Sequence, residues 1–158
     1  MTQIHLSETL LKQLQHHAEQ TYPQECVGAL MGQVQGALRK VSEVRPLENS
    51  FEPEWENTVR SQSEGYGRER RYLVSSQALF QLLKEERGTG LRVLGFYHSH
   101  PDHAALPSGT DLEWAAPWYS YLIQAVEQGN AQQLTAWQLN DTGSAFEQVE
   151  LKMSDEAV

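Results

Sequence analysis

The segment "GFYHSHPDHAALPSGTD" (Gly95–Asp111) places two histidines two positions apart and ends in an aspartate. The residues that lead into it, "LRVLGFYH", are typical of a largely buried strand. Residues two apart on a strand point to the same face, so His98 and His100 can direct both rings toward one point. Two imidazoles that converge in this way suit a single metal ion.

A third ligand is available in Asp111, which follows the Pro107-Ser108 turn in the first turn of a helix predicted to begin near Ser108. A catalytic zinc typically has three protein ligands and leaves its fourth position to water. Two histidines and Asp111 would complete such an open site. The pattern Ser108-x-x-Asp111 also matches a capping box, and histidines at strand ends are commonly solvated, so a purely structural interpretation stays open.

The rest of the chain predicts an α/β or α+β fold, with helices and strands alternating around one mixed sheet. We expect 1–158 to form a single domain, with a surface loop or insertion over 48–71 and a frayed tail over 152–158. The expected elements are a helix over 6–18 capped by Ser7, paired strands within 26–46, a helix from Ser75 or Ser76 to Gly88, a strand over 119–126 and a closing hairpin over 134–151.

Composition excludes several classes of function. The chain has 12 Lys+Arg against 21 Asp+Glu, a net charge of −9, so its average field would repel nucleic acid. No apolar run approaches the ~18 residues of a membrane span, and the first residues do not resemble a signal peptide. Cys26 is the single cysteine, which excludes an internal disulfide. We therefore expect a cytoplasmic protein that binds neither nucleic acid nor membrane.

The stretch "HSHPDHAALPSGTD" resembles the JAMM metalloprotease motif of MPN domains, in which His-x-His-Pro precedes Ser-x-x-Asp. The positions that fall on the motif are His98, His100, Pro101, Ser108 and Asp111. The family also has an upstream glutamate in a short apolar context, and "PQECVGALMG" offers Glu25. The resemblance covers most of the chain and implies a curved mixed β-sheet flanked by helices, similar to cytidine deaminase.

The resemblance also implies roles for these residues. His98, His100 and Asp111 would hold one zinc ion, which lowers the pKa of bound water from 15.7 toward ~7. Glu25 would act as the general base and pass the proton to the departing amine. Ser108 would donate its hydroxyl to the oxyanion, besides capping the helix that carries Asp111.

The resemblance implies a zinc-dependent peptidase or isopeptidase that cleaves an amide at the C-terminus of a ubiquitin-like protein. A compact chain resembles the prokaryotic members, whose implied substrates are sulfur carriers. A homodimer is compatible with the sequence. Two other classes stay open: a catalytically silent MPN scaffold, and a small iron enzyme that uses two histidines and one carboxylate.

Other residues are expected to have structural roles. Cys26 lies next to Glu25 but lacks an evident base, so we expect it to pack in the core. The remaining candidates are Asp102 and His103 in a polar turn, His16 and His17 on a helix surface, Trp114 and Trp118 in the core with a place along the cleft as the alternative, and Arg68, Arg70 and Arg71 in a solvated loop that could also meet an acidic partner.

Overall fold

The computed structural model describes residues 2–49 and 74–154. Its elements follow in the order β1 (Gln3–Ser7), α1 (Glu8–Thr21), β2 (Val27–Gln35), β3 (Leu38–Leu47), α3 (Ser76–Thr89), β4 (Arg92–Pro101), α4 (Gly109–Trp114), β5 (Ser120–Glu127), β6 (Asn130–Leu139), β7 (Phe146–Gln148) and β8 (Glu150–Ser154).

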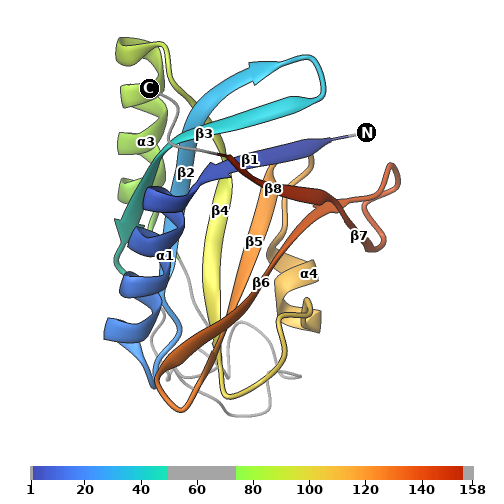
Figure 1. Cartoon of the computed structure of the whole chain (residues 1–158). Coiled ribbons are helices and arrows are strands. Elements are labelled where there is room, and N and C mark those ends of the chain that lie inside the picture. Colours follow the sequence, from blue (N-terminus) through green and yellow to red (C-terminus); the bar gives the residue numbers. More distant parts are fainter. Residues whose placement is uncertain (1, 50–73, 155–158) are drawn as a thin grey trace.

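The strands form one curved mixed sheet in the order β7-β6-β5-β4-β2-β3-β1-β8, with helices beside it (Figure 1). The pairs β1–β3, β1–β8 and β4–β5 are parallel, whereas the others are antiparallel. The predicted α+β class with a curved mixed sheet is therefore confirmed. None of the described helices is long and apolar enough to cross a membrane.

Helix α1 begins where the sequence predicts but is preceded by a strand that the prediction missed. The Ser7 side chain accepts a hydrogen bond from the backbone N–H of Leu10 at 3.2 Å, which makes Ser7 the N-cap. Leu6 was expected to belong to the helix and instead lies in β1, because β1 pairs in parallel with both β3 and β8. Such long-range pairing is not visible in local periodicity.

The predicted hairpin of β2 and β3 is present, and so is the second helix. That helix is α3, capped by Ser75, and its C-cap is Gly90 at φ 78° rather than the predicted Gly88. Gly88 lies inside the helix. Most of the predicted 48–71 loop, together with its basic cluster, lies outside the described residues.

The C-terminal region departs furthest from expectation. The predicted closing hairpin exists as β6 and β7, but the chain continues into β8, which crosses to pair with β1. Residues 152–154 were expected to fray, and they are part of β8 instead. Residues 155–158 lie outside the described part of the chain.

Strand β4 lies at the centre of the sheet and is covered on both faces. On one face Leu94 and Tyr97 pack with Leu14 of α1, and on the other Val93 packs with Leu82 of α3. Gly28 lies opposite Tyr97 on β2, where a Cβ atom would approach the tyrosine ring to 2.1 Å. The absence of a side chain there lets the ring of Tyr97 lie across β2.

Candidate active site

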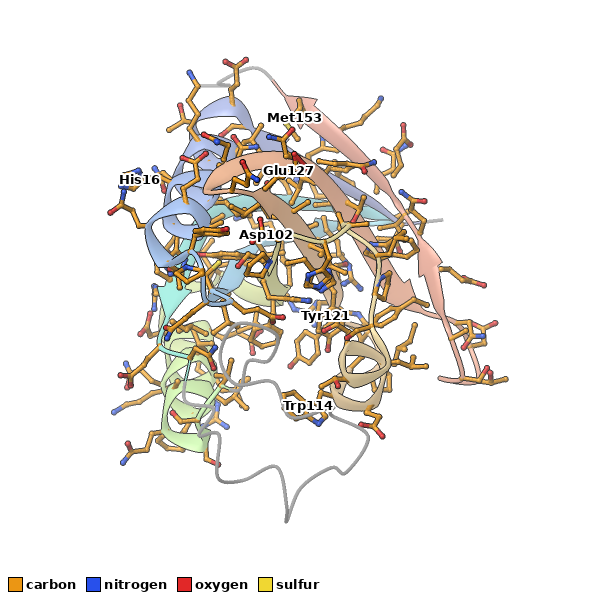
Figure 2. The ribbon with its side chains drawn as sticks, turned by 90° about the horizontal axis from the view of Figure 1, so that it is seen from below. His16, Asp102, Trp114, Tyr121, Glu127 and Met153 are labelled. Atoms are coloured by element: carbon orange, nitrogen blue, oxygen red, sulfur yellow. The ribbon has the colours of Figure 1, made fainter. Side chains whose placement is uncertain are left out.

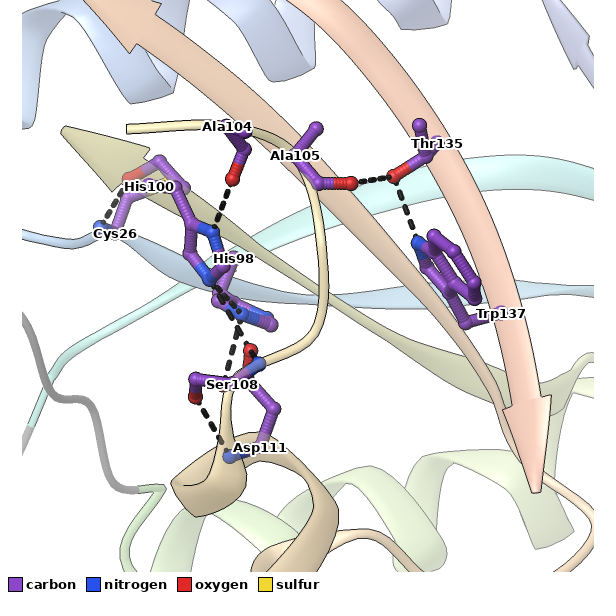
Figure 3. Close-up of polar contacts among 10 residues, drawn as sticks. Cys26, His98, His100, Ala104, Ala105, Ser108, Asp111, Thr135 and Trp137 are labelled. Carbon is purple, nitrogen blue, oxygen red and sulfur yellow. Dashed lines mark hydrogen bonds and ion pairs between the residues drawn. The ribbon is translucent and has the colours of Figure 1, made fainter. Parts of the chain in front are cut away.

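The two histidines lie at the C-terminal end of β4, with their rings directed to the same side of the strand (Figure 3). The exposed fraction is 2% for His98 and 1% for His100. Their Nε2 atoms are 3.2 Å apart. The alternation of β4 therefore brings both imidazoles together, as the sequence predicts.

Asp111 completes this cluster from the first turn of α4. Its Oδ1 lies 3.1 Å from Nε2 of His98, and its Oδ2 lies 3.1 Å from Nε2 of His100. The capping box is present as well, because Ser108 Oγ accepts from Asp111 N while Asp111 Oδ2 accepts from Ser108 N. The capping interpretation is therefore confirmed, and the same cap orients the carboxylate toward the histidines.

The spacing of the three donor groups fits a small divalent ion. An ion held tetrahedrally at about 2.0–2.1 Å by each ligand would keep the ligand atoms roughly 3.3 Å apart. The distances among His98, His100 and Asp111 are 3.1, 3.1 and 3.2 Å. Two neutral imidazoles and one carboxylate are a common donor set for zinc and also suit iron. The donor set and its spacing are therefore compatible with a metal ion.

The protonation states also favour metal binding. His100 Nδ1 lies 2.8 Å from the carbonyl oxygen of Ala104, which can only accept, so Nδ1 carries the proton and Nε2 offers its lone pair. Burial lowers the pKa of His98 and favours its neutral form. Burial alone would raise the pKa of the Asp111 carboxyl, but His98 and His100 hold it well below its usual range.

Glu25 approaches the same cluster from the chain that leads into β2. Its side chain is 2% exposed, and its carboxylate lies within 4.8 Å of ring nitrogens of His100 and His103. The backbone carbonyl of Glu25 accepts a hydrogen bond from Asn49 Nδ2 at 3.1 Å. The adjacent Cys26 N donates to Ser99 Oγ at 2.8 Å. Asn49 and Ser99 thus fix the segment that carries Glu25.

Two further sets of contacts hold the loop between β4 and α4, and no pattern in the sequence predicts either role. Asp102 Oδ2 accepts from the hydroxyl of Tyr22 at 2.6 Å, and its Oδ1 accepts from Gln128 N at 2.7 Å. Thr135 Oγ1 donates to the carbonyl of Ala105 at 2.7 Å and accepts from Trp137 Nε1 at 2.7 Å (Figure 3). These contacts place the carbonyl of the neighbouring Ala104 against His100.

The weaker histidine candidates differ from one another. His16 is exposed and points away from α1, as expected (Figure 2). His17 was expected at the surface, but its Nδ1 lies 2.7 Å from the hydroxyl of the buried Tyr97. His103 stacks on His100 with ring centroids 4.2 Å apart, and its Nδ1 bonds the carbonyl of Pro101. It borders the cluster without belonging to the His98, His100 and Asp111 group.

Cys26 and the tryptophans can also be assigned. Cys26 is buried, and burial is the main cause that raises its pKa to about 12, so it packs as a neutral thiol. The expectation of a core role is wrong for Trp118, which is 38% exposed. Trp114 is only partly buried and lines a cavity instead.

This apolar cavity, of about 290 Å³, lies between α3, β4 and α4. Phe96, two residues before His98, forms part of its wall, as do Leu79 and Leu83 of α3. Trp114 and Tyr121 also line it, and Figure 2 shows where these two side chains lie. Strand alternation puts Phe96 on the same face of β4 as His98 and His100, so the cavity lies on the face of the sheet that carries the histidines.

Known proteins resemble the chain in sequence and in fold. The sequence model of the family described as "Prokaryotic homologs of the JAB domain" matches residues 7–140. The "Probable TtuB-protein conjugate cleaving protease" of Thermus thermophilus is 30% identical over 73% of this chain and 67% of its own. The "Desampylase" of Haloferax volcanii is 40% identical over 33% of this chain and 38% of its own.

Two solved structures share the architecture over nearly the whole chain. A protein from Desulfitobacterium hafniense superposes with a TM-score of 0.76 and 25% identity, covering 97% of this chain and 94% of its own. A protein from Salinibacter ruber gives a TM-score of 0.67 and 31% identity, covering 99% and 93%.

Proposed function

The chain belongs to the family of prokaryotic homologs of the JAB domain, and on that basis we propose that it is a zinc-dependent peptidase or isopeptidase. Its substrate is an amide at the C-terminus of a ubiquitin-like protein of the sulfur-carrier class. The observation that carries the proposal is the convergence of His98, His100 and Asp111 within 3.1–3.2 Å beside the buried Glu25. The substrate class draws on the conjugate-cleaving activity in the name of the Thermus relative.

His98 Nε2, His100 Nε2 and a carboxylate oxygen of Asp111 would hold the ion. A zinc ion held there would supply Lewis acidity, which polarises a carbonyl group and lowers the pKa of water. The chain's own residues prepare the ligands: Ala104 fixes the tautomer of His100, and the Ser108 backbone N–H orients the carboxylate of Asp111.

Glu25 is the general base in this mechanism. Its carboxylate accepts the proton of the attacking water and delivers it to the departing amine, which then leaves as a neutral group. Ser108 is exposed at the start of α4, and its Oγ accepts from Asp111 N, which leaves the hydroxyl proton to be donated to the developing oxyanion. The Glu25 carboxylate thus transfers the proton, while the Ser108 hydroxyl stabilises the negative charge of the oxyanion.

The apolar cavity beside the histidines provides the contact surface for a protein substrate. Leu79 is 38% exposed and Leu83 is 42% exposed, and both line this cavity. Burial of such side chains against a partner stabilises a complex by about 25 cal/mol per Å² of apolar surface. We place this reaction in the cytoplasm, in a chain that acts as one domain.

The test is mass spectrometry of sulfur-carrier proteins that carry a C-terminal extension or an isopeptide-linked adduct, before and after incubation with the protein. Loss of the extension or adduct, abolished by a chelator and restored by zinc, is the expected result. Unchanged substrates with the zinc-loaded protein would contradict the proposed activity. Metal analysis under anaerobic conditions separates zinc from iron, for which the same ligands are suited.

A further inference from the structure

A second cluster of charged side chains lies at the opposite end of β4 from the histidines. Arg39 of β3 is only 5% exposed, while Arg92 is exposed at the start of β4. Their guanidinium carbons lie 3.9 and 4.6 Å from the centroid of the Trp118 ring. Two cations therefore meet at one aromatic side chain, which is itself 38% exposed.

The hydrogen bonds of Arg39 use only part of its guanidinium. Nη1 donates to the carbonyl of Leu94 at 3.3 Å and to Ser120 Oγ at 2.8 Å. Within the described part of the chain, Nε and Nη2 have no hydrogen-bond acceptor. Buried arginines are ordinarily paired with an anion, so the Nε–Nη2 edge of Arg39 offers two donors in the geometry that an oxyanion prefers.

The charges around Arg39 also favour the binding of an anion. The chain has a net charge of −9, yet no carboxylate among the described residues forms an ion pair with Arg39 or Arg92. Burial first, and then the nearby charge of Arg92, lower the pKa of Arg39. By contrast, Arg45 bonds the carboxylates of Glu43 and Glu85. Like charges gathered without a counter-charge are stabilised when an anion binds.

The backbone of Trp118 adds an independent observation. It follows Pro117 with φ 78°, in the left-handed region that favours glycine and is rarely adopted by a bulky side chain. Backbone strain of this kind persists where the surroundings fix it, and it gathers at ligand-binding sites. Here the residue in the left-handed conformation is the one whose indole ring contacts both guanidinium groups.

We propose that Arg39, Arg92 and Trp118 form a binding site for the phosphate group of a small molecule. A phosphate dianion matches the two positive charges. Two of its oxygens accept from Nε and Nη2 of Arg39, and Arg92 contacts the anion from the exposed side. Arg92 lies six positions before His98 on β4, about 20 Å along an extended strand, so this site is distinct from the hydrolytic one.

The test follows the guanidinium Nε–Hε signals by NMR during titration with inorganic phosphate or glycerol phosphate, at an ionic strength held constant with chloride. Saturable shifts at Arg39 and Arg92 are expected, and their location separates this site from binding at the histidines. A stronger response to glycerol phosphate than to inorganic phosphate identifies an ester as the ligand, whereas the reverse identifies the free ion. Either result supports the proposal.

Two variants provide the comparison. Arg92→Gln removes an exposed cation and should weaken phosphate binding at least about tenfold. Arg45→Gln is the matched control and should leave binding unchanged, because that guanidinium already bonds Glu43 and Glu85. Absence of saturable shifts at Arg39, equal affinity in Arg92→Gln, or acetate binding as tightly as phosphate would each overturn the proposal.

Discussion

The hydroxyl of Thr135 donates to the carbonyl of Ala105 at 2.7 Å and thereby ties strand β6 to the loop that orients His100. The neighbouring carbonyl, of Ala104, accepts the Nδ1 proton of His100. Thr135 hydrogen-bonds Ala105 and Trp137 rather than His98, His100 or Asp111. It acts through the loop, as a positioning residue.

Thr135→Val should therefore weaken zinc binding by about tenfold, since loss of a contact that orients a ligand typically costs 10–100-fold in metal affinity. Thr135→Ser keeps the hydroxyl and should bind zinc like the parent chain. Competition with a chromogenic chelator measures both affinities. If Val and Ser variants bound zinc equally, Thr135 would have only a packing role.

The cluster itself predicts about one zinc per chain, lost when its ligands are removed. His98→Ala, His100→Ala and Asp111→Ala should each lower occupancy sharply, because each leaves at most two protein ligands. Elemental analysis of the purified variants is the measurement. Stoichiometric zinc in the triple variant would show that the ion binds elsewhere.

Glu25→Gln should retain zinc and the folded structure while losing activity by about 10²–10⁴-fold. The amide has nearly the size of the carboxylate but cannot accept the proton of the attacking water. Turnover of a carrier conjugate is measured together with zinc content on the same sample. Near-normal turnover by a fully loaded variant would exclude Glu25 as the base.

The last residues of the substrate before the scissile bond should affect kcat/KM more than the leaving group does. An extended tail must pass close to His98 and His100 without side chains in the way, and glycine permits that approach. Changing the penultimate glycine of a sulfur carrier to leucine should lower kcat/KM more than changing the residue after the scissile bond. Equal cleavage of unrelated unfolded peptides would indicate a general peptidase.

Cys26 should resist alkylation in the folded chain even in mildly alkaline solution. Its pKa is raised to about 12, mainly by burial, so the reactive thiolate forms only far above neutral pH. Iodoacetamide at pH 8, followed by mass spectrometry, should leave the native protein unmodified and label it in guanidinium chloride. Rapid labelling of the native chain would show that the thiol is accessible and ionised.

The sequence predicted those parts of the fold that depend on local patterns. Ser7, Ser75 and Ser108 each precede a helical periodicity, and each caps a helix in the structure. Strand β1 was missed because five residues with two buried side chains acquire their strand conformation only through pairing with β3 and β8. The extent of β8 was missed for the same reason.

The sequence predicted the clustered residues of the site, but it did not predict the residues that hold them in place. His98, His100 and Asp111 follow one another closely in the chain, so strand alternation and a helix cap were enough to predict that their side chains converge. Thr135 and Asn49 hold the site through carbonyl groups of Ala105 and Glu25. A bond to a backbone carbonyl does not depend on the partner's side chain, which is why no residue pattern revealed these two.

The His98, His100 and Asp111 cluster belongs to one strand–loop–helix segment, whereas Glu25 lies far earlier in the chain, in the segment that leads into β2. Local unfolding that separates the start of β2 from the end of β4 would remove the base and leave the three donor groups together. In gradual denaturation, activity should then disappear at a lower concentration of denaturant than that at which zinc is released. The interval between the two transitions would measure how firmly β2 is held against its neighbour.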